Sequence, residues 1–215
     1  FTSWLDTPHS FLWLVGFAGC GKSVLCSTAI RAALVHRRGN PHIGIAYFYF
    51  TFNDQSKQDA SAMLRTLILQ LSSQASDNHS VLSRLHDEYP TAVPPRKALI
   101  YCLRQLIQSF SDVYIVVDAL DESPKNTHRE TTLDIITELR ALPESKLHLI
   151  VSSRDEPAIR ESLDAKPEEV IGMKNESVDG DIESFISQHL KENRRLRKWE
   201  ACHKQIEEAL TKGAQ

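Results

Sequence analysis

The sequence predicts an α/β fold, in which a mostly parallel β-sheet is flanked by α-helices on both faces. Two observations support this prediction. Apolar runs of strand length alternate with segments in which apolar residues recur every three or four positions, as on one face of a helix. A glycine-rich stretch, GFAGCGKS at residues 16–23, separates the first apolar run from the first helical segment. The 215 residues suffice for one sizeable domain of this kind.

The amino-terminal half begins with a strand expected at residues 11–15 (FLWLV) and a helix at residues 22–36, which the Gly-Asn-Pro sequence of residues 39–41 ends. A second strand is expected at residues 43–50, before a polar loop at residues 51–59. The apolar positions of the first helix are Val24, Leu25, Ala29, Ile30, Ala33 and Leu34. The core should also contain the aromatic residues that end the second strand, Tyr47, Phe48, Tyr49 and Phe50.

The next helices are amphipathic. The first has an apolar face of Met63, Leu64, Leu67, Ile68 and Leu71. A break at residues 72–80, a short helix ending at Tyr89 and a connector at residues 90–95 follow it. The second has an apolar face of Leu99, Ile100, Leu103, Leu106, Ile107 and Phe110. The remaining elements are expected in the order strand, helix, strand, short helix and strand, at residues 113–118, 133–142, 146–153, 154–163 and 168–173.

The glycine-rich stretch matches the phosphate-loop pattern G-x-x-x-x-G-K-[ST]. Its glycines let successive backbone N–H groups turn inward around phosphate oxygens, and the following helix presents the positive end of its dipole. Lys22 can reach the β- and γ-phosphates, and the Ser23 hydroxyl can ligate Mg²⁺. A simple glycine turn would need neither residue. The predicted nucleotide-binding residues are Gly16, Phe17, Ala18, Gly19, Cys20, Gly21, Lys22, Ser23 and Val24.

An acidic cluster follows the apolar run VYIVVD. Asp118 ends this run, where a parallel strand delivers a carboxylate to the ligand crevice, so it is the expected partner of Ser23 around Mg²⁺. Asp121 and Glu122 come next, and a carboxylate not used on the metal can orient or deprotonate an attacking water. The alternative is a strand followed by an ordinary acidic turn.

Arg154 ends the apolar run LIVSSR. An arginine at the carboxyl end of a strand would point toward the same crevice and could bind a γ-phosphate through charge-assisted hydrogen bonds. The alternative is a surface arginine paired with Asp155 or Glu156.

These motifs resemble those of the NACHT family of P-loop NTPases, within the signal-transduction (STAND) class. The resemblance rests on GFAGCGKS, on VVDALDE with a small residue directly after Asp118, and on IVSSR. The segments SAMLRTLILQLSSQ and DGDIESFISQHL are similar to fungal members. Two positions depart from the family pattern. Cys20 stands where a small or hydroxyl residue is usual, and DEP follows Arg154 in place of a directly following proline.

The resemblance implies a P-loop NTPase fold and a switch that binds ATP or GTP with Mg²⁺ and hydrolyses it slowly. It assigns Mg²⁺ binding to Ser23 and Asp118, water activation to Asp121 with Glu122, and γ-phosphate sensing to Arg154.

The resemblance also places the chain in a multidomain receptor of the NOD-like type, active in fungal self/non-self recognition or programmed cell death. It implies self-association of the full-length protein, and effector and repeat domains on the same longer chain. We therefore expect a NACHT nucleotide-binding domain at residues 1–178. A highly charged helical extension at residues 179–215 should lead toward a winged-helix domain beyond Gln215.

Other functions stay open. An assembly module could hold nucleotide without turnover. A small-molecule kinase would need an arginine-rich lid and an acceptor pocket, and the sequence shows no such lid. A regulatory GTPase would carry an N-K-x-D segment that reads guanine, and the absence of that segment favours ATP.

The composition argues against several kinds of partner and site. A hydrophobic content of 41%, a charged content of 25% and a net charge of −3 favour neither nucleic acid nor anionic membrane as a partner. The basic run at residues 191–199 is expected to be a solvated helix face. No apolar run approaches the roughly 18 residues of a membrane span. Four cysteines without C-x-x-C spacing indicate a reduced, cytoplasmic location, and the nine histidines lack metal-ligand spacing. The missing initial methionine leads us to expect a fragment of a longer protein.

Overall fold

The computed structural model describes residues 4–5, 7, 9–54, 59–75, 78–125, 127–142, 146–173, 175–193, 196, 199 and 202–213. The chain divides into two compact units, Phe1–Gly172 and Met173–Gln215. The sequence placed a division a few residues later, between residues 178 and 179. Which function each part serves stays a prediction.

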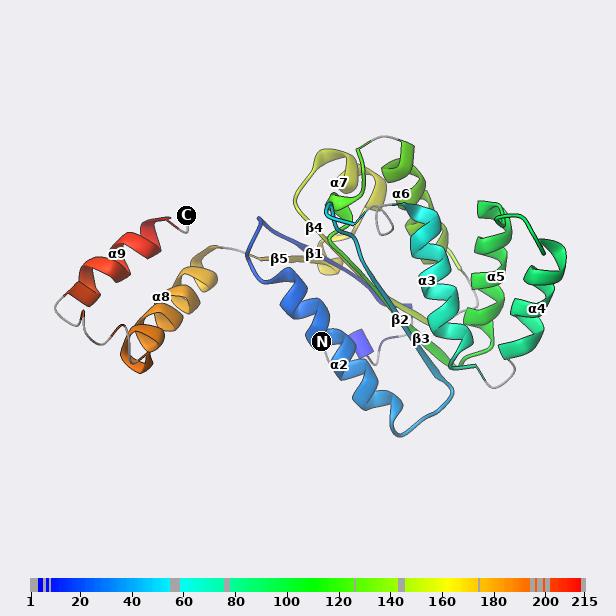
Figure 1. Ribbon diagram of the computed structural model, residues 1–215, viewed down its shortest axis with the longest axis horizontal. Helices are drawn as coiled ribbons and strands as arrows, with labels where there is room; N and C mark the ends of the chain where they lie inside the picture. The colour runs from blue at the N-terminus through cyan, green and yellow to red at the C-terminus, as the bar shows by residue number, and fades with distance from the viewer. Residues whose placement is uncertain are drawn as a thin grey trace. The chain divides into compact units, whose positions relative to one another are not determined.

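The first unit is built on one five-stranded sheet with the strand order β2-β3-β4-β1-β5 (Figure 1). All neighbouring strands run parallel, which confirms the predicted α/β fold. The strands are β1 (Phe11–Val15), β2 (Ile43–Tyr49), β3 (Asp112–Asp118), β4 (Leu147–Ser153) and β5 (Val170–Gly172). Because β4 lies between β1 and β3, the carboxyl ends of these three strands meet at one edge of the sheet.

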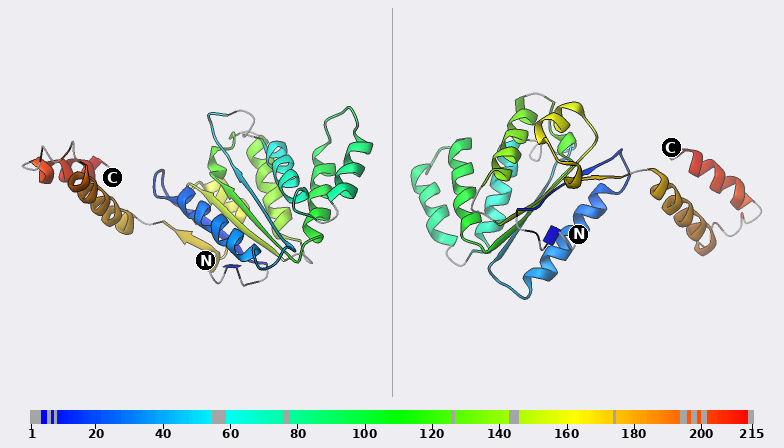
Figure 2. Two further views of the ribbon diagram at one scale, coloured as in Figure 1. Left: turned by 60° about the horizontal axis from the view of Figure 1, so that its bottom comes forward. Right: turned by 180° about the vertical axis from the view of Figure 1, so that it is seen from behind.

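Helices cover both faces of the sheet (Figure 2). Helix α2 (Lys22–Arg37) packs on one face. The opposite face is covered by α3 (Ala60–Ser72), α5 (Arg96–Gln108), α6 (Thr127–Arg140) and α7 (Pro157–Leu163). Helix α4 (Asn78–Glu88) begins inside the break that the sequence predicted at residues 72–80. The described part of this unit also contains the short 3₁₀ helices η2 (Leu120–Glu122) and η3 (Pro167–Glu169).

The core lies in two layers because side chains alternate across the sheet. On β1, Phe11 and Trp13 face the larger group of helices, and Leu14 faces α2. All five apolar residues predicted for α3 are buried. The apolar face predicted for α5 is buried within the helix, and only Phe110, which lies beyond its end, is half-buried.

The predicted apolar face of α2 is partly wrong. Val24 is 69% exposed and Leu34 is also exposed, whereas Cys26 is fully buried. The buried residues of this helix are Cys26, Ala29, Ile30 and Ala33. They follow the i, i+3, i+4, i+7 spacing of one helical face, counted from a cysteine rather than from the adjacent valine and leucine.

A second error concerns the aromatic residues at the end of β2, which were all predicted to lie in the core. Phe48 and Phe50 are buried, but Tyr47 is 39% exposed because β2 is an edge strand. The side chain of Gln70 bonds to the N–H and C=O of Tyr47 at 2.9 and 3.0 Å. Gln74 does the same for Ile45 at 3.0 and 2.7 Å. The side-chain amides of Gln70 in α3 and of Gln74 just after this helix occupy main-chain groups that an edge strand otherwise offers to another chain.

The second unit contains two helices in its described part, α8 (Asn175–Glu192) and α9 (His203–Gly213). The sequence predicted one charged helical stretch. Helix α8 ends at Glu192, the second residue of the basic run at residues 191–199, and most of the basic residues of the helix face predicted there lie outside the described residues. Four basic residues of the run lie outside the described residues: Arg194, Arg195, Arg197 and Lys198.

Candidate functional site

The predicted phosphate loop joins β1 to α2, and its shape depends on two glycines. Gly19 and Gly21 have φ angles of 83° and 91°, a left-handed conformation that costs other residues roughly 1–2 kcal/mol. Gly21 is the N-cap residue of α2. Because glycine has no side chain, it supplies no capping oxygen, and the first amides of the helix can serve an anion instead.

Lys22 lies at the centre of this loop. Its ammonium donates to the carbonyl oxygens of Gly16 and Phe17 at 2.8 and 2.7 Å. The loop is tied to the sheet by a hydrogen bond from the Gly16 N–H to the Ser153 carbonyl, at 3.3 Å. The loop therefore wraps around the lysine, and β4 holds the start of the loop.

A cavity of about 490 Å³ lies beside the loop, within the range of roughly 300–1,000 Å³ typical of ligand sites. It brings together residues from the loop, from the end of β3 and from the end of β4. The following lining residues were predicted from the sequence as site residues: Ala18, Gly19, Gly21, Lys22, Ser23, Val24, Asp118, Asp121, Glu122 and Arg154. Lining residues that the sequence did not single out for a site are Phe52, Ala119 and Ser152. Predicted residues outside the lining are Gly16, Phe17 and Cys20.

Asp118 is the buried last residue of β3. Its carboxylate accepts a hydrogen bond from the Ser152 hydroxyl of β4, and this hydroxyl also accepts from the Ala119 N–H at 3.0 Å. Asp118 and Ser23 line the same cavity with the oxygen ligands that Mg²⁺ prefers. Burial, and then the carboxylate of Asp118, raise the pKa of the nearby Cys26 thiol, so that this thiol stays neutral.

The structure pairs two of the predicted site residues. The carboxylate of Asp121, only 4% exposed, accepts from the main-chain N–H of Arg154 at 2.9 Å and from its Nε at 2.5 Å. The carboxylate of Asp121 raises the pKa of the Arg154 guanidinium. The alternative pairing of Arg154 with Asp155 or Glu156 is wrong.

Glu122 is held more loosely than Asp121. One oxygen of its half-buried carboxylate accepts from the Phe52 N–H at 3.2 Å, while the side chain lines the cavity. Both neighbouring acids line the cavity, but they differ in their contacts: Arg154 engages both carboxylate oxygens of Asp121, whereas Glu122 accepts through one oxygen from a main-chain N–H.

Arg129 is a site-supporting residue that the sequence did not reveal. It lies in α6 and is 5% exposed. It donates to the carbonyl oxygens of Asp121 and Ser123, the latter at 2.6 Å, and pairs with Glu156 at 2.6 Å. An arginine in the first turn of an amphipathic helix gives no motif signal. Ser152 was recognisable only through its place in LIVSSR beside the acidic strand.

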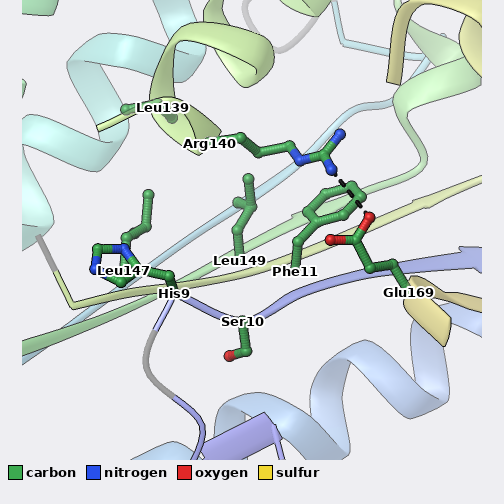
Figure 3. Close-up of a pocket in the computed structure, with 8 residues that line it drawn as sticks. All are labelled: His9, Ser10, Phe11, Leu139, Arg140, Leu147, Leu149 and Glu169. Atoms are coloured by element: carbon green, nitrogen blue, oxygen red, sulfur yellow. Dashed lines mark hydrogen bonds and ion pairs between the residues drawn. The ribbon is translucent and has the colours of Figure 1, made fainter. Parts of the chain in front are cut away.

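A second, smaller cavity lies at the opposite edge of the sheet (Figure 3). Its volume of about 100 Å³ is below that of typical ligand sites. Arg140 lies 3.9 Å above the ring of Phe11 and pairs with Glu169 at 3.0 Å. This cavity marks a structural junction between the end of α6 and the start of β1.

The described residues contain no group of three or more His, Cys, Asp or Glu residues that could hold a metal ion by themselves. Among these residues there is also no helix long and apolar enough to cross a membrane.

A protein-family model described as "Nephrocystin 3, N-terminal" matches residues 1–154, which include every residue of the candidate site. No curated protein matches. Among solved structures, a chain of Drosophila ORC bound to DNA is 15% identical with a TM-score of 0.49, over 91% of this chain and 47% of that one. A Walker-type ATPase of Pyrococcus abyssi is 12% identical with a TM-score of 0.45, over 89% and 55%. The chain thus spans about half the length of these two structures.

Proposed function

Because the chain belongs to the family described as Nephrocystin 3, N-terminal, we propose that it binds a nucleoside triphosphate with Mg²⁺ and hydrolyses it slowly, as a molecular switch. One observation carries the proposal. The phosphate loop, a strand-end aspartate, a cavity-facing glutamate and an arginine all line one cavity of nucleotide-compatible size.

Binding is assigned to the loop and the end of β3. The loop amides and the first turn of α2 would hold the phosphate oxygens, with Lys22 supplying positive charge at the β- and γ-phosphates. Ser23 and Asp118 would hold Mg²⁺, whose bound form compensates phosphate charge. Ser152 orients the Asp118 carboxylate by donating to it.

Turnover is assigned mainly to Glu122. Its carboxylate would take a proton from the water that attacks the γ-phosphorus, while the bond to the bridging oxygen of the leaving diphosphate breaks. Asp121 is less suited to this role because both of its carboxylate oxygens are engaged by Arg154. Asp121 would instead orient Arg154, whose side chain is 45% exposed and lines the cavity where the γ-phosphate would lie.

The more specific part of the proposed function rests on the resemblance of the motifs. We assign the domain to a NACHT-like switch of the STAND class, with ATP favoured over GTP, in a cytoplasmic multidomain receptor of the fungal NOD-like type. The full-length protein would self-associate, and it would carry effector and repeat domains on the same chain. The family match over residues 1–154 supports a P-loop module of this general kind.

The direct test is ligand-dependent stability. Mg²⁺–ATP at about 100 times its Kd should add roughly 2.7 kcal/mol, or about 5–11 °C in Tm for a chain of this size. Lys22→Ala should remove most of this shift, and Lys97→Ala, an exposed lysine of α5, should keep it. An equal shift in wild type and Lys22→Ala would exclude the loop as the site.

Phosphate release then separates the alternatives. Release without an acceptor supports the hydrolytic switch. Binding without release supports the assembly module, which the closed Asp121–Arg154 pair favours as second candidate. Transfer only in the presence of a small-molecule acceptor would identify a kinase.

A further inference from the structure

We propose that Arg129 is a positioning residue that couples the acidic turn after β3 to the loop after β4. Through this coupling it would hold Glu122 and the Asp121–Arg154 pair in place at the cavity. The inference rests on the proposed function for its consequence in catalysis, but the coupling itself is a property of the chain without nucleotide.

The contacts of Arg129 reach two segments that are distant in sequence. On the turn, it donates to the carbonyl oxygens of Asp121 and Ser123 and, through Nε, to the Ser123 hydroxyl at 3.3 Å. On the loop after β4, its other terminal nitrogen pairs with Glu156 at 2.6 Å. One planar guanidinium therefore binds both segments at once.

The position of these two segments explains why the coupling matters. The turn carries Asp121 and Glu122, and the loop after β4 begins with Arg154. Asp121 and Arg154 also bond directly to each other. Arg129 does not line the cavity, and it ties the main chain of one partner to the loop of the other.

Burial strengthens the Arg129–Glu156 pair, and the shape of the guanidinium group makes the arrangement specific to arginine. The Arg129 side chain is 6% exposed and that of Glu156 is 21% exposed, so their attraction is less screened than at the surface. Lys125 also lies 3.5 Å from Glu156, but it is 73% exposed and contributes little. A lysine at position 129 would keep the charge but lose the fork that reaches the carbonyls and the carboxylate together.

Helix α6 supplies a matched control at its other end. Arg140 pairs with Glu169 at 3.0 Å (Figure 3). It also donates to the carbonyl oxygen of Leu163, so it has the same combination of carbonyl and carboxylate partners. It lies at the edge of the sheet opposite the phosphate loop. Substituting Arg140 therefore removes similar bonds without touching the acidic turn.

The test compares Arg129→Gln, Arg129→Lys and Arg140→Gln by amide hydrogen exchange, without nucleotide. In wild type the N–H groups of Glu122, Ser123 and Arg154 are all hydrogen-bonded. Arg129→Gln should accelerate exchange roughly ten- to hundredfold in both segments, since bonds to a charged group are lost. Arg129→Lys should fall between wild type and Arg129→Gln, and Arg140→Gln should leave both segments unchanged.

Turnover supplies the functional readout. Arg129→Gln should lower kcat about tenfold or more while Mg²⁺–ATP affinity changes less than about threefold, because the phosphate loop is untouched. Arg140→Gln should change neither kcat, expressed per folded molecule, nor the affinity for Mg²⁺–ATP. If Arg129→Gln does not fold, Glu156→Gln removes the carboxylate partner and should accelerate exchange in the same two segments.

Each result is decisive. Unchanged exchange in both segments, or acceleration confined to the turn, would overturn the coupling. Faster exchange in both segments together with no Mg²⁺–ATP binding in wild type would support the coupling and refute the proposed function. Faster exchange with unchanged kcat would overturn the positioning role.

Discussion

The phosphate loop and the acidic turn face the same cavity, but they are shaped in different ways. The loop takes its form from its own backbone, through the left-handed conformations of Gly19 and Gly21. The turn at residues 119–123 has two main-chain hydrogen bonds of its own, from Glu122 and Ser123, but it is also held by side chains of other elements, Arg129, Ser152 and Arg154. A locally determined loop is suited to bind a constant ligand group, and a turn built from distant contacts can respond to changes elsewhere in the domain.

The largest effect that separates the two regions should come from Glu122→Gln. This change removes the proposed proton acceptor while leaving the loop intact. Single-turnover hydrolysis should slow by roughly 10²–10⁴-fold. Binding of a fluorescent ATP analogue should stay within about threefold of wild type, because the lost interaction acts mainly in the transition state. Unchanged hydrolysis would remove Glu122 from the reaction.

The next largest difference should be in how substitution of each of the two neighbouring acids changes the stability of the protein. Asp121→Asn breaks the charge-assisted bonds to Arg154 and should lower the free energy of unfolding by about 1–3 kcal/mol. Glu122→Gln should change it by less than about 0.5 kcal/mol, since this side chain faces the cavity. Urea denaturation midpoints measure both. Equal destabilisation by the two variants would show that the acids are not divided between support and chemistry.

The smallest effect tests the loop itself. At Gly19 an added Cβ would meet nothing within 4 Å, yet its φ of +83° is unfavourable for other residues. Gly19→Ala should therefore destabilise by roughly 1–2 kcal/mol. Gly172→Ala is the control, because Gly172 has the same open space without a left-handed φ, and it should be neutral within about 0.5 kcal/mol. Equal effects would show that backbone conformation does not set the shape of the loop.

The same contrast explains what the sequence could and could not predict. The strands, the parallel sheet and the loop follow from local patterns, so they were predictable. The Asp121–Arg154 pair depends on β4 lying beside β3, so the sequence did not indicate it and suggested only Asp155 or Glu156 as ion-pair partners of Arg154. The role of Arg129 depends on where α6 packs, and no local pattern indicates that. The exposed Val24 was misplaced because a buried cysteine, Cys26, defines the inner face of α2.

The central claim is that the loop governs nucleotide affinity and the acidic turn governs turnover. The most direct test measures both quantities for Lys22→Ala and Glu122→Gln, by titration with a fluorescent ATP analogue and by single-turnover hydrolysis at saturating Mg²⁺. The account predicts that Lys22→Ala loses about ten- to hundredfold in affinity, as expected for bonds to a charged group. It predicts that Glu122→Gln binds like wild type and loses only the hydrolysis rate. Equal losses of affinity in the two variants, or wild-type affinity in Lys22→Ala, would contradict it.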